Sequence, residues 1–351
     1  MSIDVLIIGQ GLAGSLLAWE LIQQGQRVLV IDNGTMNASQ VAAGLINPVT
    51  GQRLVKQAGI EYVLPATLIF YKQLANRFRQ PFFKPLPMLR ILKNPLEQQS
   101  AQKRLLQADY QGFLSAMQNA PNSITAPYGV LLQSQTGYLN TNALLTQIKR
   151  FLIENASYQQ DVFDYHEICI QPRLSWRNIQ PKHLVFCEGH HAVQNPWFGK
   201  LPFQLAKGEI VHCHSQNIQQ QHILNYGHWL IPNGEHQFKL GASFESGKTD
   251  TLATMQAKQT LLQSLSTVLP DLHPISVLDQ QVGIRPTTLD KQPLIGSHPR
   301  FTTLHIFNGF GAKGSLLIPW YARQFAQYLL QNITLPVNAN INRYYETHFA
   351  D

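Results

Sequence analysis

The segment VLIIGQGLAGS at residues 5–15 is the feature that most constrains the fold of this chain. Its apolar first half predicts a buried strand, and three glycines lead from this strand into a helix. Gly9 permits a tight turn, Gly11 lets the main chain approach a ligand, and Gly14 lets the helix pack closely on the strand. The amides at the helix N-terminus favour an anion such as a pyrophosphate. The segment therefore predicts a strand–turn–helix cradle for a dinucleotide.

A second apolar run, residues 27–31, follows the predicted helix and ends at Asp32. Asp32 follows Gly9 at close to the spacing, about 20 residues, at which an acidic side chain accepts a hydrogen bond from a ribose hydroxyl. Three glycines alone are a weak signal, and the alternative is a βα turn that binds nothing. Strand, turn, helix, strand and acid in this order favour the dinucleotide interpretation.

The length and composition describe a large globular protein. With 351 residues the chain exceeds one ordinary domain and suggests about two. Hydrophobic residues make up 44% and charged residues 13%, which favours a large interior and excludes a disordered chain. The chain shows neither a signal-peptide pattern nor an uncharged apolar run near the roughly 20 residues of a membrane span. We therefore expect a cytoplasmic protein.

Cysteine and histidine usage gives no reason to predict a metal site. Cys169, Cys187 and Cys213 are scattered and form no CxxC pair, so we expect reduced structural thiols rather than a disulfide framework or a zinc site. His212 and His214 would face one side of a strand, but no acidic or thiol partner stands at a zinc-like spacing. The predicted site therefore contains no metal ligand.

The charge balance restricts the class of ligand without choosing one. Lys and Arg outnumber Asp and Glu by 27 to 20, which gives a formal charge of +7. This charge favours an anionic cofactor, an acidic substrate or a polyanion such as RNA. The nearest basic clusters, at residues 103–104 and 149–150, are only pairs, and solvent-exposed helix faces explain them.

The apolar pattern alternates between two kinds of architecture. Residues up to about 80 have βαβ character, and several prolines then interrupt it. The predicted elements that follow are a strand at 87–92, a helix at 98–117, a strand at 129–133, a helix at 141–155 and a strand at 184–187. Short alternating segments then favour an antiparallel sheet at 209–213, 229–231 and 238–243. The last predicted helix covers residues 315–331. The sequence thus indicates one domain in three stretches and a second domain inserted in two pieces.

Further motifs follow the glycine turn along the chain. They are ASQVAAG at 38–44, KGE at 207–209, GIRP and DKQPLIG within 283–296, and NGFGAKG at 308–314 with Pro319 behind it. In this order they resemble the D-amino-acid oxidase family of FAD-dependent oxidoreductases, which includes glycine oxidase and sarcosine oxidase. Each motif is modest alone, but the ordered set is specific and covers nearly the whole chain. A nicotinamide dehydrogenase would need only the first motif.

The resemblance implies an α/β fold with two domains. A discontinuous, Rossmann-like FAD-binding domain would comprise residues 1–80, 136–205 and 285–351. An inserted α+β substrate domain, built on an antiparallel sheet, would comprise residues 81–135 and 206–284. This division agrees with the alternation of apolar patterns described above.

FAD is the cofactor that the resemblance implies, and it assigns a set of residues to FAD binding. They are Gly9, Gly11, Leu12, Ala13, Gly14, Asp32, Asn33, Ser39, Ala42, Ala43, Gly44, Glu188, Gly189, Arg285, Gly309, Gly311, Ala312, Lys313, Gly314 and Ser315. Some relatives bond the flavin covalently through a histidine near the first motif or a C-terminal cysteine. Neither residue stands at a matching place here, so we expect noncovalent FAD.

Glu188 departs from the family pattern. Relatives usually carry small residues before the glycine at this point, whereas Glu188 brings a carboxylate towards the expected diphosphate or ribose of FAD. The sequence provides no role for this side chain.

Arg285 is the first candidate for substrate binding. A guanidinium offers two parallel donors to a carboxylate, and in several family members the arginine of this motif binds the substrate carboxylate. The alternative is a structural ion pair at the domain boundary. Arg53 is the second candidate, because sarcosine-oxidising relatives carry a substrate-facing arginine in this region. Its alternative is a loop arginine in solvent or on the pyrophosphate.

Two further residues complete the catalytic prediction. Lys313 lies in the glycine turn that resembles the flavin-facing loop, where a cation would stabilise an anionic reduced flavin; the alternative is an ammonium that extends into solvent. Tyr226, with His228 and Trp229, precedes a predicted strand where relatives place aromatic residues over the substrate. Aromatic residues at a strand start are more often part of a core.

The leading hypothesis is an FAD-dependent oxidase or dehydrogenase that oxidises the C–N bond of an amino acid or another primary or secondary amine to an imine. The expected partner is therefore a small-molecule amine. A second hypothesis is oxidation of the aminomethyl side chain of a modified tRNA uridine, which the positive charge permits. A third is a flavin-binding protein without catalytic activity. The oligomeric state and the electron acceptor, oxygen or quinone, stay open.

Overall fold

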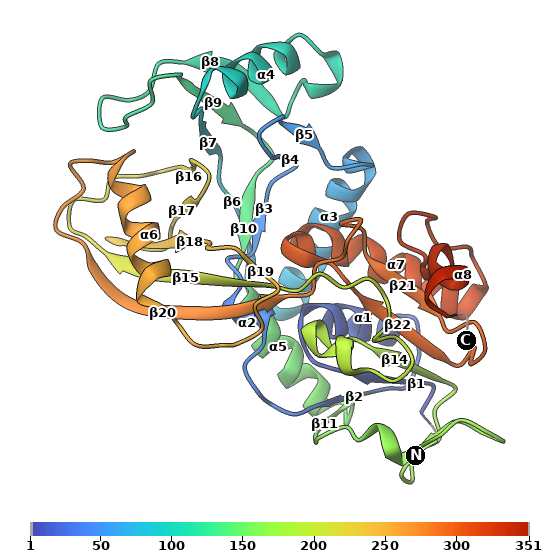
Figure 1. Cartoon of the computed structure of the whole chain (residues 1–351). Coiled ribbons are helices and arrows are strands. Elements are labelled where there is room, and N and C mark those ends of the chain that lie inside the picture. The colour runs from blue at the N-terminus through green and yellow to red at the C-terminus, as the bar shows by residue number, and fades with distance from the viewer. Residues whose placement is uncertain (1–2, 350–351) are drawn as a thin grey trace.

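A computed structural model describes residues 3–349, and the chain forms two large sheets with helices packed around them (Figure 1). The first sheet has the strand order β11-β2-β1-β14-β22-β21. These strands are β11 (Tyr158–Gln160), β2 (Val28–Asp32), β1 (Val5–Ile8), β14 (His183–Phe186), β22 (Leu304–Asn308) and β21 (Leu294–Ser297). All neighbours pair in parallel except β21 with β22. This mostly parallel sheet is the Rossmann-like arrangement that the α/β prediction expected.

The central strand β1 is buried on both faces, which explains its continuous apolar sequence. Val5 and Ile7 pack beneath helices α1 (Leu12–Gln23), α5 (Thr141–Glu154) and α7 (Gly314–Gln331). Leu6 and Ile8 point to the opposite face and join a second cluster of apolar side chains. Apolar packing on both faces therefore fixes the carboxyl ends of β1 and β2, where the glycine turn begins.

The second sheet contains nine strands in the order β19-β15-β18-β17-β16-β7-β9-β8, with β20 paired to the free side of β15. Its strands are β19 (Glu245–Ser246), β15 (Ala206–His214), β18 (Gln237–Gly241), β17 (Trp229–Pro232), β16 (Ile223–Asn225), β7 (Met88–Ile91), β9 (Val130–Gln133), β8 (Leu114–Gln118) and β20 (Ser276–Arg285). Every pair is antiparallel except β16 with β7. Strands from both predicted pieces of the inserted domain thus share one sheet.

Helix α6 (Met255–Ser266) packs against this second sheet. Its buried Leu261 and Leu265 lie in one apolar cluster with β15, β17 and β18 residues. Side chains alternate between the two faces of a strand, so the residues of the second sheet that point away from α6 face the first domain.

The remaining strands and helices lie outside these two sheets. The short strands are β3 (Leu45–Ile46), β4 (Val49–Thr50), β5 (Val55–Lys56), β6 (Phe83–Pro85), β10 (Gly137–Leu139), β12 (Ile168–Cys169) and β13 (Ser175–Trp176). The other helices are α2 (Ala38–Val41), α3 (Ile60–Phe78), α4 (Pro95–Leu105) and α8 (Tyr345–His348). None of the helices within residues 3–349 is long and apolar enough to cross a membrane.

The expectation of one helix over residues 98–117 is wrong in its second half. Helix α4 begins after the cap Asn94, whose side chain accepts a hydrogen bond from the Glu97 amide, and it ends at Leu105. Gly112 then takes a φ of +80°, which a helix does not allow, and β8 follows. Pairing of β8 with β9 overrides the local helical spacing of the apolar residues.

Candidate functional site

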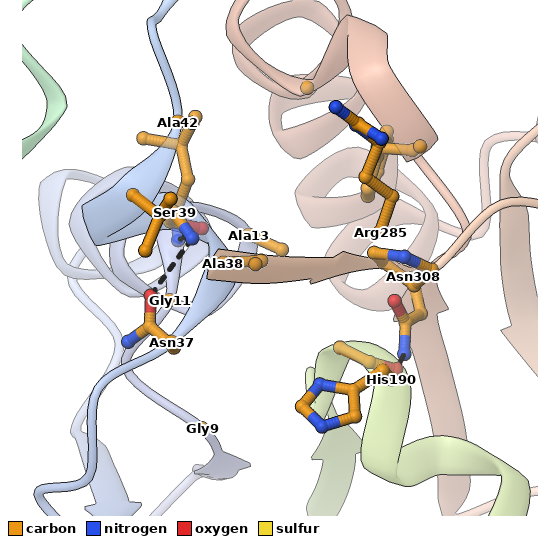
Figure 2. A pocket seen from close by; sticks show the side chains of 18 of the residues that line it. Gly9, Gly11, Ala13, Asn37, Ala38, Ser39, Ala42, His190, Arg285 and Asn308 are labelled. Atoms are coloured by element: carbon orange, nitrogen blue, oxygen red, sulfur yellow. Dashed lines mark hydrogen bonds between the residues drawn. The ribbon is translucent and has the colours of Figure 1, made fainter. Parts of the chain in front are cut away.

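A cavity of about 650 Å³ lies between the two sheets. It is lined by the carboxyl ends of β1 and β2, by the segment around α2, and by the loop before α7. The second sheet contributes residues of β15, β16, β17 and β20. In Figure 2, Arg285 lies across the cavity from the segment that carries Asn37, Ser39 and Ala42. Most of the predicted FAD-binding residues meet here.

The predicted FAD-binding residues that line the cavity are Gly9, Gly11, Leu12, Ala13, Asp32, Asn33, Ser39, Ala42, Ala43, Gly44, Glu188, Gly189, Arg285, Gly311, Ala312, Lys313, Gly314 and Ser315. Gly14 and Gly309 are not among the lining residues. A Cβ at Gly14 would collide with the carbonyl oxygen of Gly9, and a Cβ at Gly309 would lie 2.9 Å from Thr288. Both glycines therefore allow close packing behind the cavity wall.

The glycine turn presents main-chain amides to the cavity. Gly9 takes a φ of +101°, and a Cβ there would lie 2.6 Å from the carbonyl oxygen of Cys187. Gly11 is the N-cap of α1 and provides no side-chain cap, and the first turn contains no acidic residue. One amide of this turn, that of Leu12, donates to Ser39 Oγ at 3.0 Å. The positive end of the α1 dipole thus opens on the cavity, as a phosphate site requires.

Asp32 ends β2 and holds the turn in place. Its Oδ2 accepts a hydrogen bond from the Gln10 amide at 2.8 Å, and its Oδ1 accepts one from the Gly34 amide at 2.8 Å. The carboxylate lines the cavity next to Asn33. A carboxylate has about four acceptor positions, so two amides leave it able to accept from a ribose hydroxyl as well.

The segment after β2 is shaped by a capping box. The Asn37 side chain accepts from the amides of Ser39 and Gln40, and Gln40 Oε1 accepts from the Asn37 amide. Figure 2 shows the bond between Asn37 and Ser39. At the end of the segment, Gly44 takes a φ of +70° and lies directly against the backbone of Leu139. The cap and this close contact hold the segment along the cavity.

Glu188 follows β14 and lines the cavity, with partners that sequence reasoning did not find. Tyr165 donates its hydroxyl to Glu188 Oε1 at 2.6 Å, and Asn195 Nδ2 donates to Oε2 at 2.9 Å. Burial raises the pKa of the Glu188 carboxyl to about 7, against the opposing effect of these two donors. The side chain is therefore a fixed carboxyl with a proton near neutral pH.

The loop before α7 forms the third wall. Asn308 ties it to the loop after β14, because its Nδ2 donates to the Gly189 carbonyl at 2.9 Å and its Oδ1 accepts from the Gly309 amide. Helix α7 begins at Gly314 without a side-chain cap or an acidic residue in its first turn. Lys313 Nζ donates to Gln57 Oε1 at 2.6 Å, and burial lowers the pKa of this ammonium.

Arg285 ends β20 at the edge of the cavity. Its Nη1 and Nη2 both donate to the Ser243 carbonyl at 3.3 Å, and Nη1 also donates to the Lys207 carbonyl at 3.4 Å. Burial lowers the pKa of Arg285, although a guanidinium keeps its charge in proteins. No carboxylate within the described residues forms a salt bridge with it, so the structural ion pair considered as its alternative role is not formed.

Two predicted catalytic residues do not line the cavity. Arg53 lies in the exposed turn between β4 and β5, where its carbonyl accepts from Arg104 Nε at 3.3 Å. Tyr226 is 4% exposed and packs into the apolar cluster under α6. Trp229, from the same segment as Tyr226, does line the cavity. Arg53 is thus an exposed loop residue and Tyr226 is a core aromatic residue, which are the alternatives to a catalytic role that the sequence left open.

Sequence reasoning missed other lining residues, because no local motif marks them. They include Asn47, Thr50, Val162, Tyr165, His191 and Asn225. His190 also lines the cavity, and burial lowers its pKa to about 4. The residues that the structure describes contain no group of three or more His, Cys, Asp or Glu side chains placed to hold a metal ion.

The chain is similar to a known protein family and to several individual proteins. The model of the DAO family, FAD dependent oxidoreductase, matches residues 4–328. Glycine oxidase of Pseudomonas aeruginosa is 22% identical over 94% of this chain and 95% of that protein. The tRNA 5-methylaminomethyl-2-thiouridine biosynthesis bifunctional protein MnmC of Marinobacter nauticus is 24% identical over 98% of this chain, which spans 58% of that protein. The solved structure of glycine oxidase from Geobacillus kaustophilus superposes with a TM-score of 0.82 at 18% identity, covering 95% of this chain and 96% of that one.

The cavity fits the cofactor of this family. Two helix N-termini without side-chain caps, those of α1 and α7, open on it, and glycines leave room for a ligand beside the main chain. The family match confirms FAD as the cofactor, and the superposition confirms the expected α/β fold. The chain therefore belongs to the DAO family of FAD-dependent oxidoreductases.

Proposed function

We propose that this protein oxidises the C–N bond of an amino acid or a related primary or secondary amine to an imine, with FAD as the electron acceptor. Arg285 carries the proposal: a guanidinium without a carboxylate partner among the described residues lines the cavity opposite the α2 segment. The similarity to glycine oxidase supports an amino acid as substrate. In this proposal the cavity-lining residues that were predicted to bind FAD hold the cofactor.

The charges around the substrate end of the cavity support an anionic substrate. The lining residues from β15, β16, β17, β20 and the loop before α7 include Arg285 and Lys313 but no carboxylate, within the part of the chain that is described. Arg285 would bind the substrate carboxylate through its two terminal nitrogens, which fixes the position of the adjacent carbon. The acidic lining residues, Asp32, Asp161 and Glu188, all come from the first domain.

FAD, when bound, accepts the hydride from the carbon that carries the nitrogen. The amine nitrogen loses a proton, and water then hydrolyses the imine to a carbonyl compound and a free amine. Lys313 and the N-terminus of α7 lie at the wall where the family resemblance expects the flavin ring. Their positive charge would stabilise negative charge that develops during the transfer.

The two-domain division that the sequence indicates is part of the proposal. Residues 1–80, 136–205 and 285–351 would form the FAD-binding domain, and residues 81–135 and 206–284 the substrate domain. The second sheet supports this division, because its strands come from 88–133 and 206–285. We also propose that FAD is bound noncovalently and that the protein is cytoplasmic.

Anaerobic flavin reduction tests the proposed function. The FAD-loaded protein is mixed without oxygen with glycine, sarcosine, proline and a set of D-amino acids. Loss of the oxidised flavin absorbance with at least one amine is expected. A flavin that stays oxidised with every amine would refute amine oxidation, provided that dithionite still reduces it. Acid precipitation tests the cofactor linkage, since noncovalent FAD is released into the supernatant.

A second candidate substrate is a modified tRNA uridine with an aminomethyl side chain. The similarity to MnmC and the formal charge of +7 favour it. Binding to tRNA should then weaken steeply with salt, because Lys and Arg side chains displace counterions from phosphates. Filter binding at low salt measures this. Negligible binding under that condition removes the tRNA candidate and leaves the amino acid proposal intact.

A further inference from the structure

A row of side chains crosses the second sheet on its cavity face. Asn225 of β16 stands opposite Trp229 of β17, Trp229 opposite Gly241 of β18, and Gly241 opposite Ile210 of β15. Directly opposed residues of neighbouring strands share a face. Asn225, Trp229 and Ile210 all line the cavity, so this row forms its wall on the substrate side.

Gly241 shapes the middle of the row. A Cβ at this position would collide with the indole ring of Trp229. The indole therefore lies over Gly241, between Ile210 and Asn225. The row thus presents a flat apolar surface with the Asn225 amide at one end.

Behind Asn225 lies a buried ion pair that fixes the orientation of its amide. Arg90, opposite Asn225 on β7, donates from Nη1 to Asn225 Oδ1 at 2.8 Å and from Nη2 to Glu97 Oε2 at 3.2 Å. Arg90 and Glu97 are 6% and 2% exposed. A guanidinium has donors only, so the atom of Asn225 that faces it must be the oxygen. The Nδ2 group then points away from Arg90.

The Nδ2 group of Asn225 has no hydrogen-bond partner within residues 3–349. Nδ2 is not one of the fully buried side-chain atoms without a partner, as expected for a group in contact with the cavity. Its two N–H donors are therefore free to bind an acceptor inside the cavity. The consequence of the contact with Arg90 is an amide that can only donate towards the cavity.

Arg285 lies at the other end of the same wall. Its guanidinium covers Gly208 of β15, two residues before Ile210. Asn225 and β15 are three strand spacings apart, about 14 Å between backbones at about 4.8 Å each. Both residues line the cavity. A ligand that contacts Arg285 and Asn225 together must therefore be longer than glycine.

We propose that Asn225 is a specificity-determining residue that binds an acceptor oxygen on the substrate arm remote from Arg285. The substrate class is an N-substituted glycine: its carboxylate lies on Arg285, its secondary amine lies over the wall, and its N-substituent ends in a carbonyl or carboxylate bound by Asn225. This inference rests on the proposed function and narrows its substrate class. It assigns Trp229 to the apolar part of the substrate between the two polar ends.

The test compares four glycine derivatives with the FAD-loaded enzyme. N-Carboxymethylglycine and N-carbamoylmethylglycine carry the acceptor, N-isobutylglycine has a similar branched shape without it, and sarcosine lacks the arm. The rate of anaerobic flavin reduction per substrate concentration should be about 10- to 100-fold higher for the first two than for N-isobutylglycine, the range of one hydrogen bond to a fixed partner. The carboxylate and carbamoyl arms distinguish a charged from a neutral acceptor.

Variants assign the effect to Asn225. In Asn225→Asp, one oxygen still accepts from Arg90, but the group that faces the cavity accepts instead of donating. This variant should lose the preference for acceptor-bearing substrates over N-isobutylglycine. Asn225→Ala should give the same result without an added charge. Gln237→Glu is the control, because it adds a charge on an exposed residue of β18 in the same sheet and should leave the preference unchanged.

A binding measurement separates this inference from the proposed function. Thiodiacetate replaces the amine by sulfur, so it retains both carboxylates and has no C–N bond to oxidise. Its affinity, measured by titration calorimetry, should fall at least about tenfold in Asn225→Asp and Asn225→Ala but not in Gln237→Glu. Equal affinity in all variants would overturn the inference, even if amines reduce the flavin. Weaker binding in both Asn225 variants would support it, even if the amine screen failed and the proposed reaction had to be replaced.

Discussion

The guanidinium of Arg285 occupies the space that a side chain at position 208 would fill. A Cβ on Gly208 would collide with three atoms of the guanidinium group. The two residues lie on paired strands, because Gly208 of β15 is opposite Gly283 of β20, two residues before Arg285. The glycine of the KGE motif is thus explained by the arginine of the GIRP motif, although 77 positions of sequence numbering separate Gly208 from Arg285.

Gly208→Ala should displace Arg285 without removing it. The added methyl group forces the guanidinium away from the Ser243 carbonyl that it contacts. We expect the KM for amino acid substrates to rise at least about tenfold, the effect of losing about one charge-assisted hydrogen bond. Steady-state kinetics with the FAD-loaded enzyme measure this. An unchanged KM would show that the position of the guanidinium does not matter for substrate binding.

Arg285→Lys should impair substrates with a carboxylate more than substrates without one. A lysine ammonium is a point charge and cannot reproduce two parallel donors. We expect kcat/KM for an amino acid to fall about 100-fold, and kcat/KM for an amine without a carboxylate to change less than about threefold. Arg53→Lys is the matched control, because Arg53 is exposed outside the cavity. Equal losses for both substrate types would contradict a carboxylate-binding role.

Gly11→Ala and Gly14→Ala should separate cofactor binding from folding. A Cβ on Gly11 meets its nearest atom, Ser39 Oγ, at 3.4 Å and projects towards the cavity, so the apoprotein should keep its Tm and lose FAD affinity. A Cβ on Gly14 collides with the Gly9 carbonyl, so this variant should also lose about 1–3 kcal/mol of stability. Thermal melts of the apoproteins and fluorescence titration with FAD measure both effects. Identical melts for the two variants would be inconsistent with these contacts.

Local sequence chemistry predicted the elements that carry the cofactor site. The glycine turn, the strand that ends at Asp32 and the helices at 141–154 and 314–331 lie close to where periodicity and motifs expected them. These features depend on short-range rules: apolar period, glycine turns and helix starts. These elements could therefore be predicted without knowledge of the tertiary contacts.

The substrate side depended on contacts that no local pattern records. Whether Tyr226 or Trp229 faces the cavity depends on strand register, since neighbouring faces alternate along a strand. The orientation of the Asn225 amide depends on Arg90, 135 positions away in the sequence. Glu188 was recognised as unusual, but its partners Tyr165 and Asn195 come from separate loops. The roles assigned to the individual site residues stay predictions.

Glu188 should make the stability of the apoprotein depend on pH between about 4.5 and 7. Its pKa is about 7 in the folded protein and 4.5 for an ordinary glutamate, because burial disfavours the charged form. Below pH 4.5 the carboxyl is protonated in both states and contributes no difference. Between the two values the folded protein holds a proton that the unfolded chain has released, so the free energy of unfolding falls as pH rises. The full loss, up to about 3 kcal/mol, is reached above pH 7.

Glu188→Gln isolates this contribution, because glutamine resembles the protonated carboxyl in shape and has no charge. Its amide group can donate to the Tyr165 hydroxyl, and its oxygen can accept from Asn195, so both contacts are retained. The variant should be more stable than the parent protein at pH 8 and equally stable at pH 4.5. Urea unfolding of the two apoproteins at both pH values provides the four free energies. FAD carries a negative diphosphate into the same cavity, so its affinity should likewise fall above pH 7 in the parent and vary less in the variant. A stability difference that is the same at both pH values would mean that Glu188 has the same pKa in the folded and unfolded protein, so that burial does not hold its proton.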